Sequence, residues 1–280
     1  MSAMSVAFGV FTSDPNLLRC ELLRLVGELV SGESASCNAV GVGSYAQDEI
    51  LFQQFRSALD LASLSRRWAG AESAALLYHA CQLSLGMSAE ENTQPFRYRQ
   101  WMFCQTGPMA QLRGAAAELT SSLPDFLRRQ IQGEGIAELV FALFLKLLRE
   151  SGRLDDLSIG AGQAALLLGK TIRQVEELSA RMGSPVLGAL NCIATNGSLL
   201  VAARHGALPL YYRLLEGAAE CARCGLDPSM PETLPLVRAH RRRRTVVLAS
   251  HPTRPSSWIE IENQSAIAIG RGLSLQRLKI

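Results

Sequence analysis

Stretches of apolar residues typical of strands alternate along the chain with stretches in which apolar residues recur at helical spacing. The order of these stretches predicts the order of the strands and helices. Residues 5–11 form a short apolar run typical of a buried strand, and Asp14-Pro15 is a helix-start signal. Apolar side chains then recur at helical spacing, at Leu17, Leu18, Leu22, Leu25, Val26 and Leu29. The chain therefore begins with a strand that is followed by an amphipathic helix.

The middle of the chain changes from strands to helices. Residues 39–46 and 50–56 predict a hairpin, residues 74–79 and 100–104 predict two further strands, and residues 86–99 are loop-like. Helical patterns follow at residues 110–121, 134–150 and 162–182.

The last third returns to strands, predicted at residues 186–194, 198–204, 209–214, 245–250 and 265–269. Asn196-Gly197 lies between the first two of these and is the strongest short hairpin signal. Residues 216–244 are interrupted by Gly225, Pro228, Pro231 and Pro235, which predicts an exposed excursion.

Strands at both ends with helices between them predict an α+β fold, in which helices cover two antiparallel sheets. Neither an internal repeat nor a linker divides the sequence. We therefore expect a single domain over residues 1–280, with residues 216–244 as an excursion within it.

Composition narrows the possible functions. The chain has 280 residues, is 48% hydrophobic and 19% charged, and its formal net charge is +3. This apolar content predicts a sizeable core, and the small net charge argues against nucleic acid as a partner. Apolar runs are too short for a membrane span and the start lacks a secretory signal, so a cytoplasmic location without membrane association is expected.

The cysteines and the basic residues each leave two interpretations open. Seven cysteines, an odd number, favour reduced thiols in a chain of this size. Cys221 and Cys224 form one CxxC, but no second CxxC or HxxxH accompanies it, which favours two loop cysteines over half of a zinc site. No metal and no cofactor is therefore predicted. The run Arg241, Arg242, Arg243 and Arg244 is a candidate partner surface, although a solvated loop is the simpler interpretation.

Short motifs in a fixed order carry a resemblance to a known family. They are Met4 to Val10, Gly41-Val42-Gly43, Leu76 to His79, Glu91 to Phe96, Trp101 to Gly107, Gly133 to Phe141, Asn196 to Tyr212 and Val246 to Trp258. Together they span nearly the whole chain, which resembles the class II glutamine amidotransferases and above all their short stand-alone hydrolases. The resemblance implies an N-terminal-nucleophile αββα sandwich of four layers, in agreement with the class derived from the patterns.

The chemistry of that family requires residues that this chain replaces. The family uses an N-terminal Cys whose own α-amine takes the thiol proton. The matching residue here is Ser5, which follows Met4, so its nitrogen is an amide. A serine hydroxyl is also a weaker nucleophile than a thiolate unless a base activates it. No catalytic residue is therefore expected; if the chain were active, Ser5 and Gly107 would carry the reaction.

The substrate-binding positions are replaced as well. Cys81 stands where the family has the Arg that holds the substrate carboxylate, two residues after His79. Gln105-Thr106-Gly107 replaces the oxyanion-hole triplet, and Ile136 replaces the Asp that binds the substrate amine, although Glu138 of that motif is retained. The degenerate pocket thus comprises Ser5, His79, Cys81, Thr106, Gly107 and Ile136. Losing these partners together predicts loss of glutaminase activity.

Three hypotheses remain open for the function. The first is a catalytically inactive amidotransferase-like protein that acts as an interaction, scaffold or regulatory subunit, with a protein partner or a second copy of itself. The second is a serine-type amide hydrolase in which processing exposes Ser5. The third is a small-molecule sensor that uses the emptied pocket. His79, Asn92, Pro95, Phe96, Trp101 and Gly107 are interpreted as residues that hold the fold.

Overall fold

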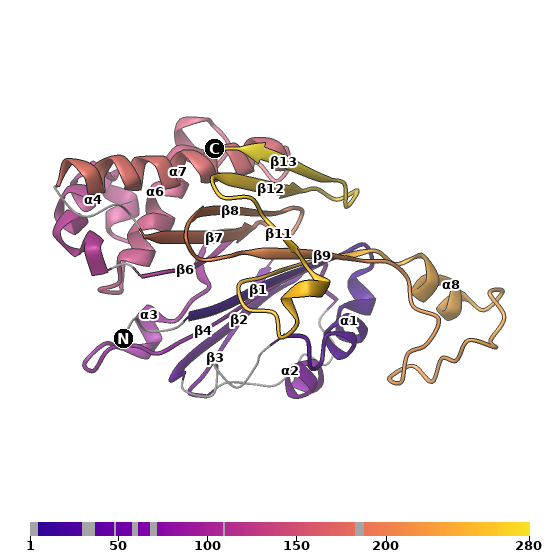
Figure 1. Cartoon of the computed structure of the whole chain (residues 1–280). Coiled ribbons are helices and arrows are strands. Elements are labelled where there is room, and N and C mark those ends of the chain that lie inside the picture. The colour runs from indigo at the N-terminus through magenta and orange to yellow at the C-terminus, as the bar shows by residue number, and fades with distance from the viewer. Residues whose placement is uncertain are drawn as a thin grey trace.

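The computed structural model describes residues 5–29, 37–47, 49–57, 61–67, 72–108, 110–182 and 188–280, which form two antiparallel sheets between two layers of helices (Figure 1). The seven strands of the first sheet are, in spatial order, β11 (Ile259–Glu260), β9 (Tyr211–Leu215), β10 (Thr245–Ala249), β1 (Ser5–Thr12), β4 (Ala75–Cys81), β2 (Ala39–Ala46) and β3 (Glu49–Phe55). The six strands of the second are β13 (Leu275–Lys279), β12 (Ser265–Ile269), β8 (Leu200–Gly206), β7 (Ala189–Thr195), β6 (Trp101–Thr106) and β5 (Phe96–Tyr98).

Helices cover the outer face of each sheet. Figure 1 shows α4, α6 and α7 over the second sheet, and α1 and α2 on the opposite side of the molecule, against the first sheet. The helices are α1 (Leu18–Arg24), α2 (Leu61–Arg67), α3 (Ala89–Asn92), α4 (Ala116–Ser122), α5 (Asp125–Arg128), α6 (Ile136–Glu150), α7 (Ala161–Arg181) and α8 (Pro235–Arg242), with 3-10 turns at Pro15–Leu17, Ala110–Ala115 and Pro255–Ser257. Among the described residues, none of these helices has the length and apolar character that a membrane span requires.

Strand β1 explains why the layers pack in this order. Successive side chains of a strand point to opposite faces. Ala7 and Phe11 pack between the sheets, whereas Phe8 and Val10 pack against the helices of the outer layer. Because both faces of β1 are buried, its sequence is a continuous apolar run rather than an alternating one. The predicted four-layer αββα sandwich is confirmed.

Aromatic contacts join the outer face of the second sheet to helix α6. Trp101 and Phe103 of β6 lie against Phe144 and Phe141 of α6, with ring centroids 5.3 Å apart in both pairs. The Trp101 indole Nε1–H also donates to the Leu154 carbonyl at 3.2 Å. These contacts support the interpretation of Trp101 as a residue that holds the fold.

Three of the described strands were not predicted from the sequence. Strand β13 lies at the edge of the second sheet and contains Gln276, Arg277 and Lys279 with little apolar character, so no buried face marks it. Strand β5 has three residues and falls inside the segment expected to be loop, and β11 has only two residues. All three are edge strands, where pairing on one side replaces the missing apolar signal.

The excursion between β9 and β10 projects from one end of the sandwich, and we call residues 216–244 the arm (Figure 1). The arm leaves and rejoins the sheet at neighbouring positions, because Leu215 of β9 pairs with Thr245 of β10. In this fully described stretch the buried apolar side chains are Leu226 and Val237. So small an apolar core contributes little to holding the arm against the body of the protein.

The basic run at the end of the arm is not simply a solvated loop. Arg241 and Arg242 end helix α8, and the Arg243 side chain is buried with only 3% exposed. Its guanidinium forms an ion pair with Glu21 of α1, which is fully buried. Sequence pattern could not place a carboxylate there, because Glu21 and Arg243 are far apart in the chain. Arg243 therefore cannot belong to an exposed partner surface, whereas Arg242 and Arg244 are exposed and Arg241 is half-buried.

We predict that the Glu21–Arg243 pair controls the stability of the contact between the arm and α1. Arg243→Ala leaves a buried carboxylate with only the more exposed Arg24, 4.0 Å away, and is expected to lower the free energy of unfolding by about 3 to 5 kcal/mol. The double variant Glu21→Leu/Arg243→Met should recover most of this loss, because it buries no charge. Urea unfolding measures both values. Arg153→Ala breaks an exposed pair with Asp156 and should cost about 1 kcal/mol or less; an equal loss in both single variants would contradict the prediction.

Candidate functional site

The residues of the expected pocket come from the ends of three strands and the start of one helix. Ser5 begins β1 and lies opposite Cys81, the last residue of β4. Ser5, His79 and Cys81 have the same strand parity as Ala7 and Leu77, so all three face the space between the sheets. Thr106 ends β6 and has the parity of Met102 and Cys104, which face the same space from the second sheet. These four positions therefore meet at one end of the layer between the sheets.

Ile136 lies elsewhere. It is the first residue of α6, is 7% exposed, and packs in the apolar cluster between the second sheet and its helices. An apolar side chain in this position offers no charge to an amino group. The structure thus places Ile136 in an outer apolar layer, and the other pocket side chains between the sheets.

His79 joins the two sheets through a hydrogen bond. Its ring is fully buried, and Nε2 lies 3.1 Å from the carbonyl oxygen of Gln105. Since a carbonyl only accepts, Nε2 carries the proton and Nδ1 is bare; Nδ1 is also buried without a hydrogen-bond partner. Burial lowers the pKa of His79 to about 4, against the opposing effect of the Gln105 hydrogen bond. At neutral pH the ring is an uncharged link between strands β4 and β6.

The Cys81 thiol provides neither the positive charge of a guanidinium nor a reactive thiolate. Burial, with a smaller contribution from the nearby Cys37, raises the pKa of the Cys81 thiol to about 12. The thiol therefore remains protonated at neutral pH, and neither a positive charge nor a thiolate stands opposite Ser5.

The segment of Gln105 to Gly107 satisfies its own polar groups. The Gln105 amide N–H donates to Oε1 of Gln94 at 2.6 Å, and its side-chain Nε2 donates to the Gly107 carbonyl at 2.9 Å. Gly107 has φ +120, and a Cβ there would lie 2.4 Å from the Ala189 carbonyl oxygen. The Gln105 side-chain amide thus closes a turn instead of pointing toward a ligand, and position 107 requires glycine for backbone reasons.

Glu138, the retained member of its motif, anchors a loop. Its carboxylate accepts the amide N–H of Gly133 at 2.7 Å and that of Gln132 at 3.2 Å. Asn92 holds the same loop, because its Oδ1 accepts the Glu134 amide at 3.1 Å and its Nδ2 donates to Ser88. Burial raises the pKa of Glu138 above its usual value, partly opposed by the two amide bonds. These contacts support a fold-holding role for Asn92 and give Glu138 the same role.

A groove of about 850 Å³ lies beside these residues without including the expected pocket. Its walls come from β3, β5 and helix α6, and include Glu49, Arg97, Arg99 and Glu138. None of the six pocket residues lines it. Sequence reasoning did not find the groove, because its walls come from separate segments of the chain that only the fold brings together.

Cys221 and Cys224 are not isolated loop cysteines. The structure places Cys20 of α1 and His240 of α8 next to them, with all four potential ligand atoms within 4.8 Å of one another. Sequence reasoning missed this cluster, because Cys20 lies about 200 residues from the CxxC and His240 was assigned to the basic run. The CxxC was the available signal, and the other two side chains are far from it in the sequence.

Comparison with solved structures agrees with the fold. The chain is similar to a glutamine aminotransferase class-II domain protein from Silicibacter pomeroyi, with a TM-score of 0.61, 17% identity, and 98% of each chain covered. It is also similar to glutamine phosphoribosylpyrophosphate amidotransferase from B. subtilis, with a TM-score of 0.55 and 12% identity, where it spans 49% of that chain. A structure described as a predicted glutamine amidotransferase from Pseudomonas aeruginosa has a TM-score of 0.52, 15% identity and 95% of its length covered.

These likenesses establish the fold class. The chain has the fold of class II glutamine amidotransferase domains, an N-terminal-nucleophile sandwich, as the sequence motifs indicated. No protein-family model and no curated protein sequence matches it. At identities of 12 to 17% the comparison concerns the fold alone, and the chemistry has to be argued from the residues of the site.

We predict that His79 makes the stability of the protein depend on pH. The pKa of a histidine is about 6.5 in the unfolded chain, and that of His79 is about 4 in the folded one. As the pH falls from about 6.5 toward 4, the unfolded chain binds a proton that the folded chain does not, so stability declines, by up to about 3 kcal/mol for this group. His79→Gln keeps a donor for the Gln105 carbonyl but does not titrate. Urea unfolding between these pH values should show a shallower decline for the variant; equal slopes would contradict the assignment.

Proposed function

We propose that this chain is a catalytically inactive amidotransferase-like protein that acts by binding a protein partner. The observation that carries this proposal is the chemistry of the site, where uncharged side chains stand in place of the reactive and charged groups and both His79 and Gln105 donate to carbonyls of the protein itself. The fold supplies the scaffold, and the arm supplies the surface that we assign to the partner.

The nucleophile position supports inactivity. Ser5 is bonded to Met4, so its nitrogen is a peptide amide with no basic lone pair. The nearest titratable groups on the neighbouring strand do not replace that base. Burial lowers the pKa of His79 to about 4, which makes its bare Nδ1 a weak base, and the Cys81 thiol opposite Ser5 stays protonated.

The substrate-binding positions support the same conclusion. Glutamine carries a carboxylate and an ammonium group, and a buried site holds such charges only with charged or hydrogen-bonding partners. The matching positions here hold Cys81 and the buried Ile136. Thr106 stands in the place of the side-chain oxyanion donor, and the neighbouring Gln105 side chain donates to the Gly107 carbonyl. A glutamine in this site would lose its hydration without compensation.

The arm supports the partner-binding half of the proposal. Leu234 and Leu236 are each 45% exposed, and they lie at the start of α8 in the part of the chain that projects from the sandwich (Figure 1). The exposed Arg238 and Arg242 follow at a spacing of four residues, on one side of the same helix. Apolar side chains flanked by guanidinium groups suit a protein surface that is apolar at its centre and acidic at its rim.

We predict that the purified chain releases no ammonia from glutamine above the background given by the Ser5→Ala variant. The physical reason is that Ser5 has no base and the site has no charged partners for the substrate. The intact mass should be measured on the same material, because a chain beginning at Ser5 would have a free α-amine and belong to the alternative of a serine-type amide hydrolase. Ammonia release that disappears in Ser5→Ala would refute inactivity.

We predict that partner binding depends on the arm. Affinity purification from the native host should recover a partner with the wild-type chain and lose it with Leu234→Glu/Leu236→Glu, because two charges replace the apolar centre of the contact. Leu166→Glu is the matched control, since Leu166 of α7 is 49% exposed but lies on a different helix. A monomer without a partner, or equal loss in the control, would count against the arm as the binding surface.

A further inference from the structure

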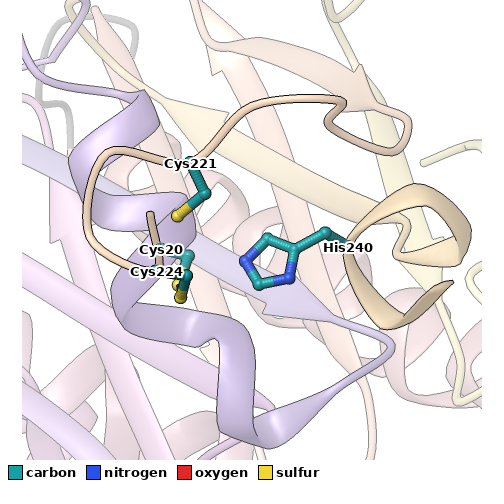
Figure 2. Close-up of side chains that lie close together, drawn as sticks. All are labelled: Cys20, Cys221, Cys224 and His240. Atoms are coloured by element: carbon teal, nitrogen blue, oxygen red, sulfur yellow. The ribbon is translucent and has the colours of Figure 1, made fainter. Parts of the chain in front are cut away.

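Three cysteines and one histidine meet where the arm contacts the body of the protein. Figure 2 shows Cys20, Cys221 and Cys224 with their sulfur atoms grouped together, and the ring of His240 turned toward them. Cys20 lies on α1, Cys221 and Cys224 on a turn of the arm, and His240 on α8. The four potential ligand atoms all lie within 4.8 Å of one another.

The spacing fits a tetrahedral metal ion. Sγ of Cys20 lies 3.6 Å from Sγ of Cys224. Zinc–sulfur bonds of about 2.3 Å at tetrahedral angles would separate two sulfur atoms by roughly 3.8 Å. A disulfide requires about 2.05 Å, so the two sulfurs are not bonded to each other.

His240 is oriented as a metal-ligating histidine would be. Its side chain is fully buried, and Nδ1 lies 2.9 Å from the Leu236 carbonyl oxygen. Because the carbonyl accepts, Nδ1 carries the proton, and the bare Nε2 is buried without any hydrogen-bond partner. A buried acceptor without a partner costs free energy. A metal ion on Nε2 would satisfy it, and the carbonyl on the other nitrogen is the usual means of fixing the ring of such a ligand.

The turn that carries Cys221 and Cys224 is closed by its own backbone. The Cys221 amide donates to the Leu226 carbonyl at 3.0 Å, the Leu226 amide donates back at 3.1 Å, and the Cys224 amide donates to the Cys221 carbonyl at 3.1 Å. Gly225 completes the turn with φ +66, a conformation that favours glycine. The bonds fix the two cysteines at the short spacing found in zinc sites.

The surrounding charges are compatible with a bound cation and three thiolates. Three thiolates and one Zn²⁺ have a net charge of −1. Arg223 lies within electrostatic range of Cys224, and Arg19 within range of Cys20. Glu21, next to Cys20, is already paired with Arg243 and adds no uncompensated carboxylate.

We propose that Cys20, Cys221, Cys224 and His240 bind one zinc ion that fastens the arm to helix α1. Sulfur and imidazole donors suit zinc, and are not the oxygen ligands that calcium and magnesium require. Four protein ligands leave no open position for a substrate, so the ion is structural. On binding, each thiol loses its proton to solvent and the three sulfurs and Nε2 donate electron pairs to the metal.

A structural zinc ion also helps to hold the arm against the body of the protein. Leu226 and Val237 are the buried apolar residues of the arm, so apolar burial adds little to the contact that the Glu21–Arg243 pair makes with α1. A zinc ion that joins α1, the Cys221–Cys224 turn and α8 adds a further link between the arm and α1 beside this ion pair. This inference does not depend on whether the chain is catalytically active.

The experiment is a metal analysis of the full-length chain, purified without a metal-affinity tag. We expect about one zinc ion per chain in the wild type and less than about a tenth of that in Cys221→Ser and Cys224→Ser, because three ligands hold zinc far more weakly than four. Cys81→Ser is the matched control, since it removes a half-buried thiol outside the cluster and should retain zinc. Cobalt added to the metal-free wild type should give the thiolate charge-transfer bands and the red d–d bands of a tetrahedral site.

A second measurement covers the case in which a variant does not fold. Removal of zinc from the wild type by a chelator should speed trypsin cleavage within residues 216–244 and leave the sandwich intact, and added zinc should reverse the change. A metal-free wild type that shows no cobalt thiolate bands would overturn the proposal. A Cys20–Cys224 disulfide in freshly purified protein, or equal loss of zinc in Cys81→Ser, would overturn it as well.

Discussion

The rest of the structure depends on the burial of the side chains that lie between the two sheets. Strand β1 is buried on both faces, so each side chain that enters this space must be apolar or find its hydrogen-bond partner inside the protein. At the end of this space where β1 begins and β4 ends, polar side chains must meet the same requirement. His79 meets it as a neutral ring bound to the Gln105 carbonyl, and Cys81 meets it as a protonated thiol. The His79 and Cys81 side chains at this end of the space are therefore uncharged at neutral pH.

The fold was predictable because its signals are local. The continuous apolar run of β1, the Asn196-Gly197 turn between β7 and β8, and the helical leucine spacing of α6 and α7 each appear within a few residues. The order of these elements, together with the motifs of the family, was enough for the four layers. Strand β13 could not be predicted in the same way, because its pairing with β12 depends on a partner strand and not on its own apolar pattern.

The site was predictable only in part, since its residues contact partners that are far away in the sequence. The motif order singled out positions 5, 81 and 136, but it could not show that Ile136 lies in the outer apolar layer. From the sequence, Arg243 and His240 were interpreted as members of a solvated basic run. Their neighbours Glu21 and Cys20 lie on α1, far away in the chain, so no local pattern indicates that the arm packs against them. Charged residues in a run are therefore poor guides to exposure when a helix far away in the chain lies against them.

The connection between β9 and β10 determines where the fold can accommodate insertions and deletions. Leu215 and Thr245 are cross-strand neighbours, so the two ends of the arm are no farther apart than the ends of an ordinary hairpin turn. Insertions or deletions at this point leave strand register undisturbed, since register is determined by the pairs on either side. The length of the arm can therefore change without altering the architecture of the sandwich, provided that the buried Glu21 of α1 keeps a partner such as Arg243.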